Sequence, residues 1–135
     1  MDKLSSARRS ENMRRIRSRD TLPEIAVRSI IHRMGFRFRL HKKDLPGKPD
    51  IVLASMHKVV FVHGCFWHQH KICREGRIPK LRPEYWIPKL QRNCDRDTQH
   101  RRNLRKLGWQ SLVVWECEIE RATLLERKLE RFLNN

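Results

Sequence analysis

The sequence has no run of 18 apolar residues, no hydrophobic segment typical of a signal peptide and no lipidation motif at either end. These absences argue against a membrane-spanning, secreted or lipid-anchored protein, and we expect a soluble, cytoplasmic chain. No internal repeat or low-complexity segment is visible either. At 135 residues the chain is long enough to bury a modest hydrophobic core, which favours a single domain.

Acidic residues are scarce in this chain. The 15 Asp and Glu residues are outnumbered by 31 Lys and Arg, which gives a formal net charge of +16. An excess of this size favours a polyanionic partner. A membrane surface would also attract it, but the missing membrane and lipid-anchor signals make nucleic acid the favoured partner.

Cysteine is also infrequent, with four residues in the chain. Four thiols could form two disulfides, but the sequence lacks the character of a small secreted, disulfide-stabilised scaffold. Three of them can be grouped with a histidine as ligands of a zinc-type site, whereas Cys94 stands apart. This grouping favours a reducing compartment.

The first 19 residues are rich in arginine and poor in apolar side chains. We expect residues 1–19 to form a basic arm that becomes ordered on its partner. A solvated helix or a frayed terminus explains the same composition equally well. Residues 20–135 then form the expected single domain.

The hydrophobic pattern predicts an α/β fold with a mixed β-sheet flanked by helices. Thr21-Leu22-Pro23-Glu24 is a capping box, and the apolar spacing after it predicts a helix that stops at Gly35. The other expected elements are strands over 36–40, 50–54 and 58–63, a helix from Pro83 to Leu107 with a kink or break at Pro88, a strand over 109–115 and a helix over 123–133.

A tight hairpin is predicted where the strands 50–54 and 58–63 follow one another. The register that fits the short turn pairs Ala54 with Val59, which places Asp50 opposite His63 with Cβ atoms about 5 Å apart. A carboxylate at a rigid strand end can hold a cation that activates water and stabilises charge on a phosphate. Alternatively Asp50 only belongs to a proline-rich turn, and the neighbouring His63 and the basic composition make this the weaker interpretation.

Two further acids are candidates for the same site. Asp97 falls on the apolar stripe of its helix, where a carboxylate is costly unless it has a partner. A core salt bridge or a place in an active site would each explain it. Glu24 is explained by its capping box alone, and in isolation that is the better interpretation.

A second group of side chains has the composition of a structural zinc site. Cys65, His70 and Cys73 are separated by four and two residues, and Cys117 follows a predicted strand end. Thiolates and an imidazole in tetrahedral array would leave no open coordination position. The alternative is that Cys117 and Cys94 are both buried core thiols.

Large aromatic rings surround these ligands. Phe66 and Trp67 are adjacent, so they cannot both point into one core from a strand, and Trp86 lies in a region of mixed charge. Exposed rings in a cationic cleft are suited to stack on or wedge between bases. The alternative is that Trp86 packs its helix on the sheet, as we expect for Trp109 and Trp115.

These same residues carry a resemblance to a known family. The sequence is similar to the bacterial very short patch repair (Vsr-type) DNA mismatch endonucleases from about residue 5 to 133. The matching segments are Asn12-Met13-Arg14, Arg19-Asp20-Thr21, Leu45-Pro46-Gly47-Lys48-Pro49-Asp50, His63-Gly64-Cys65-Phe66-Trp67-His68, Asn93, Arg96-Asp97, Leu107-Gly108-Trp109 and Val114-Trp115-Glu116-Cys117. The histidine–glycine–cysteine block followed by Phe-Trp-His is the most specific of them.

The resemblance implies a restriction-endonuclease-like core. It implies an enzyme that nicks DNA on the 5′ side of the thymine in T·G mismatches, which arise when 5-methylcytosine deaminates. A polymerase and a ligase would then complete repair. The partner is double-stranded DNA, a monomer is expected because one strand is nicked, and repair proteins could recruit the enzyme in the bacterial nucleoid.

The resemblance also implies roles for individual residues. Asp50 and the backbone carbonyl of Val62, where the family usually has threonine, would bind Mg²⁺. Glu24, His63, His68 and Asp97 would arrange water and protons, with His63 a candidate general base. Zinc ligands map to Cys65, His70, Cys73 and Cys117, a DNA wedge to Phe66, Trp67 and Trp86, and a DNA clamp to the arm around Met13 and Arg14.

Two other functions are kept as alternatives. One is a related restriction or junction-resolving nuclease of the same fold, which would act on intact or branched DNA. The other is a non-catalytic, zinc-stabilised DNA-binding protein, in which Asp50, His63 and Asp97 would be incidental. Such a protein would bind in a salt-sensitive manner and would not nick DNA.

Overall fold

The computed structural model describes residues 21–70 and 80–135, which form a four-stranded mixed sheet flanked by helices. Its elements are α2 (Leu22–Arg33), β1 (Arg39–Leu40), β2 (Ile51–Leu53), the 3₁₀ turn η1 (Ala54–Met56), β3 (Lys58–His63), α3 (Pro83–Lys106), β4 (Gln110–Trp115), the 3₁₀ helix η3 (Glu116–Glu120) and α4 (Ala122–Leu133). The predicted α/β class is confirmed. The basic arm expected over residues 1–19, with Met13 and Arg14, lies outside the described residues, and so does Cys73.

The sheet has the strand order β1-β2-β3-β4. The pairs β1–β2 and β2–β3 are antiparallel, whereas β3 and β4 run parallel. The parallel pair requires a crossover, and α3 supplies it. Because β4 is an edge strand, it is mostly half-buried, with Val114 its one fully buried residue.

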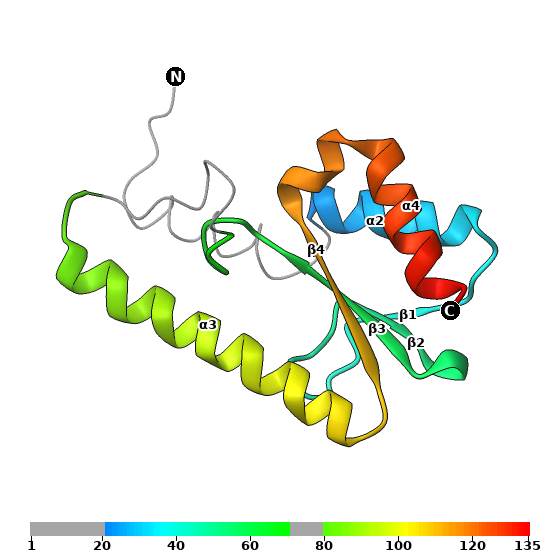
Figure 1. Cartoon of the computed structure of the whole chain (residues 1–135), viewed down its shortest axis with the longest axis horizontal. Helices are drawn as coiled ribbons and strands as arrows, with labels where there is room; N and C mark the ends of the chain where they lie inside the picture. The colour runs from blue at the N-terminus through cyan, green and yellow to red at the C-terminus, as the bar shows by residue number, and fades with distance from the viewer. Residues whose placement is uncertain (1–20, 71–79) are drawn as a thin grey trace.

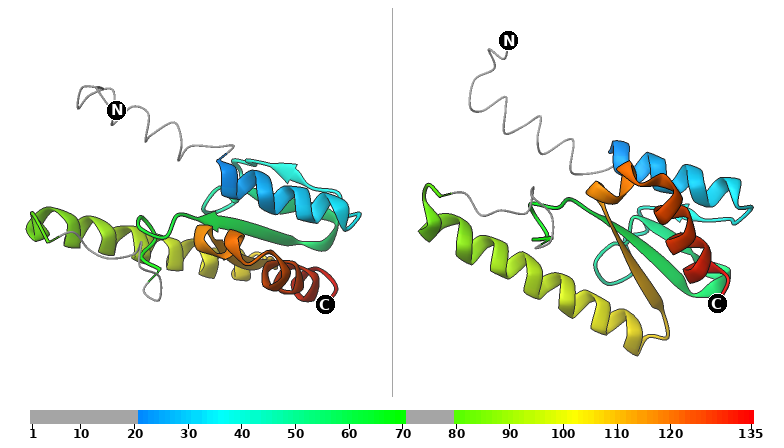
Figure 2. Two further views of the ribbon diagram at one scale, coloured as in Figure 1. Left: turned by 90° about the horizontal axis from the view of Figure 1, so that it is seen from above. Right: turned by 45° about the horizontal axis from the view of Figure 1, so that its top comes forward.

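The helices cover both faces of the sheet. On one face Val27 and Ile31 of α2 and Leu129 of α4 pack with alternate strand residues such as Val60. On the other face Leu104 of α3 packs with the intervening strand residues Val59 and Phe61. Figure 1 shows this arrangement, with α2 and α4 on one side of the sheet and α3 on the other. The right-hand view of Figure 2 shows α3 extending well past the ends of the strands.

The helix α2 begins and ends as the sequence predicts. Thr21 is the N-cap, and its hydroxyl oxygen accepts a hydrogen bond from the backbone N–H of Glu24 at 3.3 Å. Gly35 follows the last turn with a φ of +89°, a left-handed conformation that favours glycine.

Two predicted boundaries are wrong. The strand expected over 36–40 is limited to β1, because Phe36 and Phe38 pack against the core cluster that α2 and α4 share, and the chain pairs with β2 only from Arg39. The helix α3 also continues through Pro88 without a break. Pro88 lies in the exposed first turns of α3. Because proline has no N–H, one backbone carbonyl of the preceding turn lacks its helical hydrogen bond, and water can reach that carbonyl.

The predicted hairpin register is wrong by two residues. The observed pairs are Leu53 with Lys58 and Val52 with Val59, because Ala54 belongs to η1 rather than to the strand. His57 closes this turn in the left-handed conformation, with a φ of +53°. Asp50 therefore does not lie opposite His63, although a two-residue shift keeps both on the same face of the hairpin.

Among the described residues, no helix is both long and apolar enough to cross a lipid bilayer.

Candidate active site

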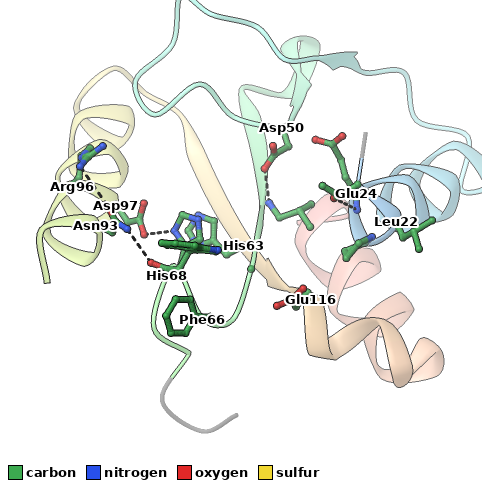
Figure 3. Close-up of a pocket in the computed structure, with 15 residues that line it drawn as sticks. Leu22, Glu24, Asp50, His63, Phe66, His68, Asn93, Arg96, Asp97 and Glu116 are labelled. Carbon is green, nitrogen blue, oxygen red and sulfur yellow. Dashed lines mark hydrogen bonds and ion pairs between the residues drawn. The ribbon is translucent and has the colours of Figure 1, made fainter. Parts of the chain in front are cut away.

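A pocket of about 670 Å³ opens between α2, the ends of β2 and β3, and the projecting part of α3 (Figure 3). Its lining includes all five residues predicted to be catalytic, which are Glu24, Asp50, His63, His68 and Asp97. They come from four separate segments of the chain. The sheet and its two flanking layers bring them to one place.

Asp50 stands immediately before β2, and its carboxylate is held by the neighbouring strand. Its Oδ2 accepts a hydrogen bond from the backbone N–H of Val62 at 2.7 Å. Burial and, to a smaller extent, the nearby Glu24 carboxyl raise the pKa of Asp50 to about 7, and the Val62 N–H only partly opposes them. The site is therefore one where negative charge is poorly compensated by the protein itself.

Glu24 points away from its helix terminus and into this site, with only 2% of its surface exposed. Its backbone, not its carboxylate, makes the observed bond to the N-cap Thr21. The carboxylate lies 3.4 Å from Nε2 of His41 and 4.0 Å from Arg28. Capping alone therefore does not explain the burial of Glu24.

Glu24, His41 and Asp50 form a group of donors that fits a divalent cation. One ligand atom from each lies within 4.8 Å of the others. The buried carboxylate of Glu24 and the half-buried carboxylate of Asp50 repel one another, and a bound cation would relieve that repulsion. Figure 3 shows the carboxylates of Glu24 and Asp50 facing the same space.

His63, His68 and Asp97 form a second group on the α3 side of the pocket. Nδ1 of His68 is 2.5 Å from Oδ2 of Asp97. The rings of His63 and His68 are stacked with centroids 3.7 Å apart and planes inclined by 8°. The partner that the sequence requires for an inward-facing Asp97 is thus His68.

The protonation of this group follows from its surroundings. Burial and, to a smaller extent, the adjacent His68 lower the pKa of His63 to about 3, so His63 is neutral near pH 7. Partial burial would raise the pKa of Asp97, but the hydrogen bond and the electrostatic interaction with His68 outweigh it and hold that pKa below its ordinary value. Asp97 is therefore ionised and can orient the His68 ring.

Three of the four predicted zinc ligands lie together. Nδ1 of His70 is 3.7 Å from the sulfur of Cys65 and 3.4 Å from the sulfur of Cys117. Ligands at normal zinc bond lengths in a tetrahedron are about 3.5–4 Å apart, which these distances match. Cys117 reaches the loop because β4 runs parallel to β3 and both end at the same edge of the sheet.

Cys94 is separate from that group. It lies on α3, where its thiol donates to the backbone carbonyl of His68 at 3.6 Å. The alternative in which Cys94 and Cys117 are both core thiols does not fit Cys117, which is half-buried and beside His70.

The aromatic side chains form one cluster beside the pocket. Phe66, Trp67 and Trp86 contact one another with ring centroids 5.0–5.9 Å apart. All three are half-buried, and none belongs to the two hydrophobic core clusters of the described chain. The ammonium group of Lys89 lies 5.5 Å from the centre of the Trp67 ring, which adds positive charge at this edge.

The structure adds residues whose roles the sequence pattern did not indicate. Oε1 of Glu116 accepts the backbone N–H of Cys65 at 2.9 Å, and the amide of Asn93 donates to the carbonyl of Trp67 at 3.3 Å. These bonds tie the loop after β3 to the start of η3 and to α3. Trp115 was expected only to pack in the core, yet its ring stacks on His70 at 4.3 Å and meets His63 edge-on at 5.4 Å.

His41 was also missed, since it lies in a short polar stretch with no motif around it. Glu116 and Asn93 were recognised only as matching positions of a family. No local spacing relates any of these residues to the catalytic candidates, so their placement depends on the assembled sheet.

Comparison with known proteins finds matches along most of the chain. Residues 1–74 match the family described as DNA mismatch endonuclease Vsr. The chain is 50% identical to the type II nicking enzyme V.XorIIP of Xanthomonas oryzae over 133 residues, which cover 98% of this chain and 97% of that protein. It is 41% identical to the type II nicking enzyme V.NmeAIP of Neisseria meningitidis, covering 98% of this chain and 94% of that protein.

A further relative carries the family's own name. The chain is 42% identical to the DNA mismatch endonuclease Vsr of Escherichia coli over 118 residues, covering 87% of this chain and 75% of that protein. The fold, the grouping of acids and histidines and these identities lead to one conclusion: the chain belongs to the Vsr family of DNA endonucleases.

Proposed function

We propose that this endonuclease is a Mg²⁺-dependent, restriction-endonuclease-like enzyme that nicks DNA on the 5′ side of the thymine in a T·G mismatch. Such mismatches arise when 5-methylcytosine deaminates, and the nick would start very short patch repair. The observation that supports this most is the convergence of the buried Glu24 carboxylate, the half-buried Asp50 carboxylate and an Asp–His pair in one pocket beside three clustered aromatic rings. The specificity for T·G mismatches rests on the family resemblance that the sequence motifs carry.

Asp50 would hold the Mg²⁺ together with the backbone carbonyl of Val62, and Glu24 lies close enough to contribute. The ion would supply charge stabilisation at the phosphate and a more acidic water. The raised pKa of Asp50 supports this assignment, because a carboxylate so poorly compensated by the protein gains most from a cation.

We assign the general base to His68 rather than His63. The ionised Asp97 accepts Nδ1–H of His68, which leaves Nε2 free to take a proton from an attacking water. His63 is 6% exposed and has a pKa near 3, so it is a poor base near neutral pH. Stacked against His68, it keeps that ring in the plane that Asp97 requires.

The remaining residues would contact the DNA or hold the loop after β3 in place. Phe66, Trp67 and Trp86 would form the wedge that enters the duplex next to the mismatch, at about 1–3 kcal/mol for each stacked base. A zinc ion held by Cys65, His70, Cys117 and Cys73 would keep that loop rigid. The arm around Met13 and Arg14 would clamp the duplex, and one monomer would suffice for one nick.

A nicking assay tests the central proposal. Duplexes with a T·G mismatch, with matched pairs and with a branch are incubated with Mg²⁺, and the cut strand is mapped. We expect one nick 5′ to the mismatched thymine, and none in the matched duplex. Cleavage of matched or branched DNA instead would favour a related restriction or junction nuclease.

Asp50→Ala provides the control for chemistry. We expect this variant to lose Mg²⁺-dependent nicking while it retains mismatch binding, because the carboxylate is placed to serve the metal and not the duplex. Nicking by Asp50→Ala at the wild-type rate would exclude the assigned metal site. Mismatch binding by the wild type without any nicking would indicate a non-catalytic DNA-binding protein.

A further inference from the structure

His41 lies beside the proposed metal site without any role so far. It follows β1 directly and has a φ of +52°, a left-handed conformation that is uncommon outside glycine. Its backbone N–H donates to the backbone carbonyl of Asp50 at 3.2 Å. The conformation and this bond together fix His41 against the residue that carries the metal-binding carboxylate.

The side chain of His41 points into the same site. Its Nε2 atom is buried and lies 3.4 Å from Oε2 of Glu24. One donor atom from each of His41, Glu24 and Asp50 lies within 4.8 Å of the others, which is compatible with ligands around a single ion.

We propose that His41 is a third side-chain ligand of the cation bound by Asp50 and Glu24. This inference rests on the proposed metal site and extends it to a set of two carboxylates and one imidazole. Oxygen ligands suit Mg²⁺, whereas an imidazole is a better ligand for first-row transition metals; Mn²⁺, the weakest binder of that series, also accepts oxygen ligands. The site would therefore bind Mn²⁺ more tightly than Mg²⁺, and His41 would be the source of that preference.

A positioning role is the competing explanation, in which His41 only pairs with Glu24. Arg28 already brings a positive charge to the same carboxylate at 4.0 Å. If His41 only positioned Glu24, its loss would weaken Mg²⁺ and Mn²⁺ binding by similar factors. As a ligand it would weaken Mn²⁺ binding selectively.

The experiment measures metal binding directly, without DNA and without turnover. The full-length, zinc-loaded protein is titrated with Mn²⁺ by electron paramagnetic resonance, and Mg²⁺ is measured by competition. We expect His41→Gln to weaken Mn²⁺ binding about tenfold or more and Mg²⁺ binding less than about threefold. The spin-echo modulation from an imidazole nitrogen on the bound Mn²⁺ should be present in the wild type and lost in His41→Gln.

Two variants complete the design. His32→Gln changes an exposed histidine at the end of α2 and should leave affinity and modulation unchanged. Asp50→Asn should abolish binding of both ions. His41 is not a ligand if His41→Gln keeps the nitrogen modulation, or if it weakens the binding of Mn²⁺ and Mg²⁺ by equal factors. In either case the proposed metal site itself is retained. If the wild type binds neither ion, the proposed metal site fails with it.

Discussion

At the scale of single residues, the site depends on how each carboxylate is compensated. Asp50 receives one backbone N–H and faces a second acid, whereas Asp97 is paired with His68 at 2.5 Å. The pKa values of the two acids are therefore shifted in opposite directions. The raised pKa of Asp50 favours cation binding. The lowered pKa of Asp97 keeps this residue ionised, so that it can orient His68.

The raised pKa of Asp50 predicts a pH-dependent cost in the Mg²⁺-free protein. The folded state prefers the protonated carboxyl of Asp50. The wild-type protein is therefore at its most stable, as far as this group is concerned, below pH 3.8, and it loses that stability as the pH rises through about 7. Asp50→Asn removes the charge and should raise the free energy of unfolding at pH 8, on the order of 2–4 kcal/mol, with little effect near pH 4. Urea unfolding of the wild type and the variant, compared in the same buffer at each pH, measures this difference.

The exposed Asp44 provides the matched control. Asp44→Asn should change stability by a few tenths of a kcal/mol at either pH. An Asp50→Asn variant that is no more stable than the wild type at pH 8 would show that the buried carboxylate carries no such cost.

A second prediction concerns the orientation of His68. Asp97→Asn keeps the shape of the side chain but removes the charge that holds Nδ1–H, so we expect the nicking rate to fall by about 100-fold or more. Mismatch affinity should change little. Single-turnover nicking and fluorescence anisotropy separate the two effects.

Asp95 lies on the same helix, is exposed and bonds to Gln91. Asp95→Asn should therefore nick at the wild-type rate. Equal losses in Asp95→Asn and Asp97→Asn would mean that helix charge, and not the contact with His68, controls the rate.

At the scale of elements, the loop after β3 carries His68 and two rings of the aromatic cluster, Phe66 and Trp67. It is tied to η3, which follows β4, through Glu116 and to α3 through Asn93. The group formed by Cys65, His70 and Cys117 ties it to η3 a second time. A loop fixed at several points can hold rings next to DNA without collapsing onto the core.

Zinc removal tests this arrangement. We expect one tightly bound zinc per chain by metal analysis, and chelation should unfold the loop and destabilise the domain, whereas omitting Mg²⁺ should stop only the chemistry. Cys117→Ser should lose the zinc and lower the melting temperature. Cys94→Ser should keep it, because Cys94 bonds to the His68 carbonyl outside this group.

The zinc assignment would be contradicted by metal analysis that finds much less than one zinc per wild-type chain. Loss of zinc in Cys94→Ser with retention in Cys117→Ser would also contradict it.

At the scale of the whole molecule, the formal charge of +16 dominates. Lysine and arginine that neutralise phosphates release counterions, so affinity for matched duplex should fall about 100-fold or more between 50 and 200 mM salt. Fluorescence anisotropy with a matched duplex measures this slope. A slope near zero would show that the basic surface does not contact the DNA backbone.

Much of the architecture was predictable from local pattern. The Thr21 cap and Gly35 stop of α2, the strand β3 and the closing helix α4 all follow from periodicity and capping chemistry. The length of β1 was not predictable in this way. Phe36 and Phe38 follow the alternating pattern of a strand, but they pack against α2 and its core. Tertiary packing overrode a correct local pattern.

The candidate site was predictable in its residues but not in its contacts. The sequence by itself determined the basic charge, the elements and the residue types that carry chemistry. Only the tertiary structure decided the hairpin register, because strand alternation has a period of two and is satisfied equally after a two-residue shift. It also decided that Cys117 meets His70 and that His41 joins Glu24, since each of these pairs belongs to different segments that only the assembled sheet and its flanking helices bring together. The stacking of His63 on His68 depends on the path of the loop between them.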